Sequence, residues 1–81
     1  MFNEKIFSKN LDTLIKAKNW TAYKFAKELG IYQSTVSRWK SGERFPSMDI
    51  IWKIADLFGI SIDQLVGREP LPDWVKKGKH D

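Results

Sequence analysis

Residues 33 to 41, QSTVSRWKS, combine hydrogen-bonding side chains with two strongly apolar ones. If they form a helix, at about 100° per residue, the polar side chains cover an arc of roughly 140° while Val36 and Trp39 face the other way. A helix this short gains little stability in isolation, so it must bury Val36 and Trp39 against its neighbours. The polar arc is then left for a partner outside the domain. Its members are Gln33, Ser34, Ser37, Arg38 and Ser41.

An amide, short hydroxyls and a guanidinium on one helical face suit the edges of base pairs. The major groove of B-DNA admits an α-helix, and within it glutamine can bond adenine at two points and arginine can bond guanine in the same way. We therefore predict that Gln33, Ser34, Ser37 and Arg38 read bases. The alternative for Gln33 and Ser34 is a polar helix start that faces water, and for Arg38 it is an ion pair with a nearby glutamate.

The distribution of charge along the chain favours a polyanionic partner. The net charge is +4, and residues 1–48 carry nine Lys or Arg against four Asp or Glu, whereas residues 49–73 carry two against five. We predict that hydroxyls and cations near the polar arc contact DNA phosphates, although any single lysine could equally be a solvated surface charge. These predicted phosphate contacts are Tyr23, Lys24, Tyr32, Lys40, Ser41 and Arg44.

Apolar residues at helical spacing predict four further helices, so we expect an all-α fold, a compact five-helix bundle. Asn3 and Thr21 are suited to cap the first two helices, and Ser61 with Gln64 has the spacing of a capping box. No stretch alternates apolar and polar residues for long enough to predict a strand. The expected helical segments are residues 3–19, 21–30, 33–41, 47–59 and 61–67.

The composition changes after Gly67, where two prolines and mixed charges follow. We expect residues 1–67 to form the domain and residues 68–81 to be a C-terminal tail or a short docked helix. Trp74 and Val75 argue against complete disorder of this segment, and they could either close over the core or take part in a dimer contact.

Residues 21–41 have the spacing of two helices that cross steeply through a short turn. Small Ala26 lets the helices approach, and Gly30 can adopt the positive φ that ends the first of them. The stretch LGIYQSTVSRWKSGERFPS, followed by IIWKIADLFGISIDQL, resembles the phage-repressor and Cro-like (XRE-type) helix-turn-helix family over residues 8–66.

The resemblance implies a five-helix, sequence-specific, repressor-like DNA-binding domain that usually acts as a dimer on a two-fold symmetric operator. Matched residue by residue, Gln33 and Ser34 fall at the start of the recognition helix, where family members contact bases. Ser37 and Arg38 lie one turn further along the same face.

Two positions depart from the family pattern. Ala22 stands where many members have a glutamine that braces the base-reading side chain and touches a phosphate, so that contact cannot be carried over. Tyr32 stands where members often have a capping serine or threonine, and it is a poor N-cap. We expect the hydroxyl of Tyr32 or Tyr23 to reach a backbone phosphate instead.

The chain has few of the residues from which catalytic or metal sites are built. It has no cysteine and one histidine, His80, and its carboxylates form no convincing acid–base pair, so we expect no enzyme, no cofactor and no metal site. We expect Trp39 and Trp52 to pack in the core rather than to stack on single-stranded nucleic acid, because they occur among apolar residues at helical spacing.

No apolar run approaches the roughly 20 residues that span a bilayer, and the first ten residues lack the apolar segment of a signal peptide, so we expect no membrane association and a cytoplasmic location. The sequence thus predicts a sequence-specific, double-stranded DNA-binding transcriptional regulator, a repressor that acts as a homodimer. The alternative, from a different class, is a protein-interaction module such as an antitoxin or adaptor whose C-terminal segment docks a partner protein.

Overall fold

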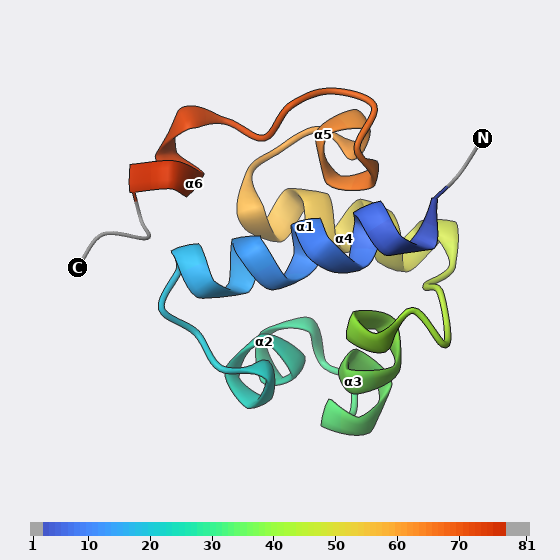
Figure 1. Cartoon of the computed structure of the whole chain (residues 1–81). Helices are drawn as coiled ribbons and strands as arrows, with labels where there is room; N and C mark the ends of the chain where they lie inside the picture. Colours follow the sequence, from blue (N-terminus) through green and yellow to red (C-terminus); the bar gives the residue numbers. More distant parts are fainter. Residues whose placement is uncertain (1–2, 78–81) are drawn as a thin grey trace.

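The computed structural model describes residues 3–77, and within that range the chain forms six α-helices and no strand (Figure 1). The five helices that the apolar spacing predicts are all present, so the all-α prediction is confirmed. A sixth helix lies in the C-terminal segment, where the sequence left a tail or a docked helix open. None of the helices within residues 3–77 is long and apolar enough to cross a bilayer. The helices are α1 (Glu4–Ala17), α2 (Ala22–Leu29), α3 (Gln33–Ser41), α4 (Met48–Phe58), α5 (Ile62–Val66) and α6 (Asp73–Lys77).

Side chains cap the N-terminal ends of three helices at the predicted positions. Asn3 Oδ1 accepts hydrogen bonds from two backbone N–H groups in the first turn of α1, at 2.9 and 3.2 Å. Thr21 Oγ1 accepts one from α2 at 3.1 Å. Ser61 and Gln64 form the predicted capping box, each accepting from the other's backbone N–H at 3.0 Å. These bonds satisfy N–H groups that have no intrahelical partner, and so they fix where α1, α2 and α5 begin.

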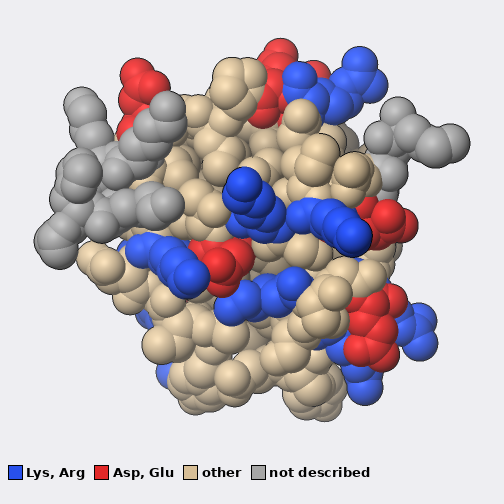
Figure 2. All heavy atoms as spheres, in the orientation of Figure 1, with Lys and Arg blue, Asp and Glu red and all other residues tan. Residues whose placement is uncertain are grey.

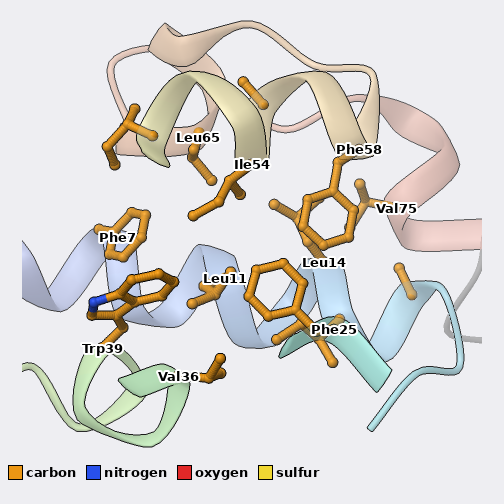
Figure 3. Packing of buried hydrophobic residues seen from close by; sticks show 14 of the residues in the cluster. Phe7, Leu11, Leu14, Phe25, Val36, Trp39, Ile54, Phe58, Leu65 and Val75 are labelled. Atoms are coloured by element: carbon orange, nitrogen blue, oxygen red, sulfur yellow. The ribbon is translucent and has the colours of Figure 1, made fainter. Parts of the chain in front are cut away.

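One apolar core joins the helices around α1, which runs across the middle of the molecule with α2 and α3 below it and α5 and α6 above it (Figure 1). Its Phe7, Leu11 and Leu14 are fully buried and face side chains from the other helices (Figure 3). The rings of Phe25 and Phe58 stack with their centroids 5.7 Å apart, which joins α2 to α4. Val36 and Trp39 bring α3 into the same core from one side.

The C-terminal segment adds to this core. Val75 of α6 is 2% exposed, and Leu71 and Trp74 are half-buried against the core. α6 packs on α1, and Lys18 Nζ of the α1 C-cap lies 5.2 Å from the centroid of the Trp74 ring, within range of a cation–π interaction. The apolar side chains of α6 are therefore used inside the domain. The boundary at residue 67 stays a prediction.

The two tryptophans expected in the core differ in solvent exposure. Trp39 is 4% exposed, as expected, but Trp52 is 61% exposed and the expectation for it was wrong. Residue 52 lies about 100° around the helix axis from Ile51, so its side chain projects away from the apolar stripe of α4. That stripe consists of Ile51, Ile54, Ala55 and Phe58.

Candidate nucleic-acid interface

The turn between α2 and α3 ends one helix and redirects the chain into the next. Gly30 has a φ of +78°, a left-handed conformation that residues with side chains rarely adopt. The N–H groups of Gly30 and Ile31 both donate to the carbonyl of Ala26, at 2.8 and 3.0 Å. No neighbouring atom lies within 4 Å of where a Cβ would stand, so glycine is needed here for its backbone conformation and not for space.

α3 buries one face and exposes the other, as its sequence predicts. Val36 is fully buried, and the backbone carbonyl of Trp39 accepts a hydrogen bond of 2.5 Å from the buried hydroxyl of Ser8 on α1. The four predicted base-reading side chains are exposed, and within residues 3–77 none of them forms a hydrogen bond or an ion pair. They are Gln33, Ser34, Ser37 and Arg38.

The two predicted phosphate-contacting tyrosines lie beside the start of α3. Tyr23 is 61% exposed and Tyr32 is 83% exposed. Both line a hollow of about 330 Å³ between α2 and α3, together with Gln33. Tyr32 is the N-cap residue of α3 but makes no capping hydrogen bond through its side chain, as expected for this residue type. The structure thus brings both tyrosines to the hollow that Gln33 also lines.

Two of the predicted phosphate-contacting lysines are held by carboxylates. Lys24 Nζ lies 2.7 Å from Glu28 Oε2 on α2, and the hydrogen bond from Lys24 lowers the pKa of the Glu28 carboxyl. Lys40 Nζ lies 3.1 Å from Asp12 Oδ1 on α1. Sequence reasoning missed both pairs. The first has the i,i+4 spacing that predicts such a pair, whereas the second joins helices that are distant in the sequence.

Asp12 binds a second lysine as well, since its Oδ2 lies 3.0 Å from Lys16 Nζ. Partial burial acts to raise the pKa of the Asp12 carboxyl, but the hydrogen bonds and positive charges of Lys16 and Lys40 outweigh it and lower the pKa below the usual 3.8. Asp12 is therefore ionised at neutral pH, and its carboxylate links α1 to the last turn of α3.

The remaining predicted phosphate contacts stand at the end of α3. Ser41 Oγ donates to the carbonyl of Arg38 at 3.0 Å and accepts from the N–H of Glu43 at 3.3 Å, so its hydroxyl is engaged in the helix end. Gly42 ends α3 with a φ of +80°. Arg44 is exposed and forms no ion pair within residues 3–77.

Sequence reasoning also missed a basic hollow of about 490 Å³ between α1 and the last turn of α3. Lys5 and Lys9 of α1 line it together with Lys40. Figure 2 shows basic side chains gathered over α1 on this face around acidic atoms. The i,i+4 spacing of residues 5 and 9 puts them on one helical face, but nothing in the sequence places them beside residue 40.

No cluster of His, Asp or Glu side chains within residues 3–77 is arranged to hold a metal ion. His80 lies outside the described residues.

Comparison with known proteins extends these observations. The sequence profile described as Helix-turn-helix matches residues 11–65. The chain is 44% identical over 63 residues to the HTH-type transcriptional regulator AnsR of Bacillus subtilis, an alignment that covers 74% of this chain and 54% of AnsR. It is 45% identical over 53 residues to the cryptic phage CTXphi transcriptional repressor RstR of Vibrio cholerae, covering 65% of this chain and 47% of RstR.

The fold is also similar to a solved structure. The solution structure of the SOS-response transcriptional repressor LexA from Eubacterium rectale superimposes with a TM-score of 0.76 at 30% identity, covering 85% of this chain and 73% of that one. The chain spans about half the length of AnsR and RstR. The family profile matches more than half of this chain, and the helices that it covers include α2 and α3 with the turn between them. The chain therefore belongs to the helix-turn-helix family of DNA-binding transcriptional regulators.

Proposed function

We propose that this protein is a sequence-specific, double-stranded DNA-binding transcriptional regulator, a repressor that places α3 in the major groove and acts in the cytoplasm without catalysis. The observation that carries the proposal is the division of α3 into two faces. Val36 and Trp39 hold it against the core, and the opposite face carries four side chains without partners among the described residues. RstR and LexA, to which the chain is similar, are both named repressors.

Within this proposal, base reading and backbone binding belong to different side chains. Gln33, Ser34, Ser37 and Arg38 read base edges, since they are exposed, unpartnered and able to donate in the groove. The backbone contacts that need no rearrangement come from Arg44 and from the hydroxyls of Tyr23 and Tyr32, which are all exposed.

The predicted contacts from Lys24, Lys40 and Ser41 compete with partners that these side chains have in the free protein. Each lysine has a carboxylate partner in the free protein, and the Ser41 hydroxyl is bonded to the backbone at the end of α3. A phosphate must therefore compete with Glu28 for Lys24 and with Asp12 for Lys40. Because ion pairs at exposed positions are weak, a phosphate of DNA can compete with these carboxylates.

The homodimer is part of the same proposal. Two large apolar side chains one turn apart on α4, Met48 and Trp52, are 65% and 61% exposed, and a second copy of the chain would remove them from water. On a two-fold symmetric operator, the two copies of α3 would lie about 34 Å apart, one turn of DNA. The molar mass of the protein on and off DNA, measured by sedimentation, tests this part, and a monomer on the operator would contradict it.

The protein-interaction alternative has less support. It requires the C-terminal segment to offer apolar side chains to a partner, yet Val75 is buried and Trp74 is half-buried within the domain itself. The relatives reported above are named as transcriptional regulators or repressors. We therefore retain the regulator as the proposed function.

The test is selection of bound duplexes from a random double-stranded DNA pool at physiological salt, followed by sequencing. The proposal predicts enrichment of an inverted repeat whose half-sites are centred about one helical turn apart. A variant with Gln33, Ser37 and Arg38 all replaced by alanine is the matched control, because these side chains are exposed and their loss leaves the core intact. Equal enrichment by this variant and the wild type, or no enrichment by a folded wild type, would contradict the proposal.

A further inference from the structure

The basic hollow between α1 and α3 is lined by lysines that take no part in the proposed base reading by α3. Its lining includes three lysines and one aspartate, which are Lys5, Lys9, Lys40 and Asp12. Lys5 and Lys9 are exposed, and within residues 3–77 neither forms an ion pair. A hollow with this excess of positive charge attracts an anion.

The hollow begins where the base-reading face of α3 ends. Lys40 and Ser41 belong to the last turn of α3 and also line the hollow. Ser41 lies one helical turn beyond Ser37 on the outer face, so the two surfaces are continuous. Lys5 and Lys9 stand one turn apart on α1, along the opposite side of the hollow.

The dimensions of DNA bring a phosphate strand to this edge. A helix with its side chains is about 10 to 12 Å across, and the major groove is about 12 Å wide, so a helix in the groove has a sugar-phosphate backbone close along its flank. The flank of α3 that faces α1 is the one occupied by the hollow.

We propose that this hollow binds a phosphate of the DNA backbone, which makes α1 a second backbone-binding element through Lys5 and Lys9, and that Asp12 limits the strength of this contact. The inference rests on the proposed function and deepens it. It adds to the interface two lysines that lie outside the helix-turn-helix segment itself.

Asp12 is placed to limit the contact in two ways. Its carboxylate lies 3.1 Å from the ammonium of Lys40, which also lines the hollow, so it competes with a phosphate for that cation. It also lines the hollow itself, where its negative charge opposes that of a phosphate. Because phosphate contacts are independent of base sequence, Asp12 reduces binding to all DNA by a similar factor and leaves the choice between sequences to the base contacts of α3.

The experiment measures the binding constant for one duplex of arbitrary sequence over a range of salt concentrations. The proteins are the wild type, the double variant Lys5→Ala/Lys9→Ala, Asp12→Asn, and Lys53→Ala as the control. Lys53 is an exposed lysine on α4 outside the hollow, so its removal changes the net charge without touching the proposed site. Thermal unfolding of each variant, followed by circular dichroism, shows that it is folded.

Each phosphate contact contributes about 0.9 to the slope of log K against log salt. The double variant is expected to flatten the slope by about one unit, whereas Lys53→Ala leaves it at the wild-type value. Asp12→Asn is expected to steepen the slope by up to about one unit and to raise affinity for this duplex, because Lys40 becomes available to a phosphate.

The possible failures are distinguishable. If the wild type binds DNA but the double variant keeps the wild-type slope, the hollow is not a phosphate site, although the proposed function stands. If Asp12→Asn keeps the wild-type slope while the double variant flattens it, the role given to Asp12 is overturned. If the wild type shows no salt-dependent binding to any duplex, the proposed function fails and the inference fails with it.

A second arm separates backbone phosphate from a free phosphate ion. Inorganic phosphate is titrated into the protein without DNA, and binding is followed by NMR shifts of the backbone amides around the hollow. The proposal predicts no saturable binding at millimolar phosphate. Saturable binding that is lost in the double variant, with an unchanged DNA slope, would reassign the hollow to a small anion.

Discussion

α3 and α4 are consecutive helices of similar length that use their side chains in opposite ways. α3 has nine residues and buries two of them, whereas α4 has eleven and buries four. Both end at a glycine in the left-handed conformation, so the difference lies in the faces and not in the ends. A helix that keeps most of its surface for a partner depends on its neighbours for stability. The core around α1 and α4 supplies that stability, and α3 supplies the contacts.

The largest expected effect comes from the buried face of α4. Ile54 is fully buried, so Ile54→Ala should lower the free energy of unfolding by about 2 to 5 kcal/mol, through lost burial and the cavity left behind. Urea denaturation measures this change. Lys53→Ala, at an exposed position on the same helix, should change it by less than about 0.5 kcal/mol. Similar losses of stability for both variants would contradict the claim that the buried face of α4 stabilises the fold.

The turn that presents α3 should be sensitive to backbone conformation. Gly30→Ala places a side chain at a φ of +78°, which should cost about 1 to 2 kcal/mol of stability. Gly30→Asn is the matched control, because asparagine tolerates this conformation better than alanine does. Thermal or urea unfolding compares the two. If alanine and asparagine cost the same, the left-handed backbone is not what residue 30 supplies.

The hydroxyl at the start of α3 should affect binding and not folding. Tyr32→Phe removes one hydrogen bond to a phosphate, so affinity should fall by about 0.5 to 1.5 kcal/mol equally on all duplexes. Stability should not change, since the Tyr32 side chain is 83% exposed and does not cap α3. Fluorescence anisotropy measures the affinity, and Tyr23→Phe tests the other hydroxyl in parallel. Unchanged affinity for Tyr32→Phe on every duplex would exclude Tyr32 as a phosphate contact.

The smallest expected effect is the contribution of the Asp12 ion pairs to stability. Lys16 and Lys40 lower the pKa of Asp12 in the folded state, so the carboxylate stabilises the fold above the pKa of the unfolded chain. This contribution is lost as the pH falls through the lower folded pKa. Asp12→Asn should therefore cost about 0.2 to 1 kcal/mol near neutral pH, and the urea midpoints of variant and wild type should converge as the pH falls below the folded pKa of Asp12. A difference that stayed constant with pH would show that the ion pairs do not cause it.

The parts of the molecule that the sequence predicts are those with local causes. Helix starts at Asn3, Thr21 and Ser61 follow from side-chain capping, and the outward face of α3 follows from its apolar spacing. The exposure of Trp52 has a local cause too, because its angle from Ile51 could have been calculated from the sequence.

The remaining features depend on tertiary packing. The pair of Asp12 with Lys40 exists because α1 and α3 lie side by side, and no spacing within either helix shows that contact. The same holds for the hollow that Lys5 and Lys9 line, and for the burial of Val75 against the core. The base-reading and phosphate roles of the α3 side chains stay predictions, since exposure shows that they can meet a partner but not which one.

The most direct test of the account compares Gln33→Ala with Arg44→Ala on a panel of operator duplexes, each with one base pair changed. We predict that Gln33→Ala loses about 1 to 3 kcal/mol of discrimination at one base position and that the other positions keep their preference. Arg44→Ala should weaken all duplexes by a similar factor and flatten the salt slope by about one unit. Equal weakening of every duplex by Gln33→Ala would contradict the central claim that the outward face of α3 reads DNA sequence.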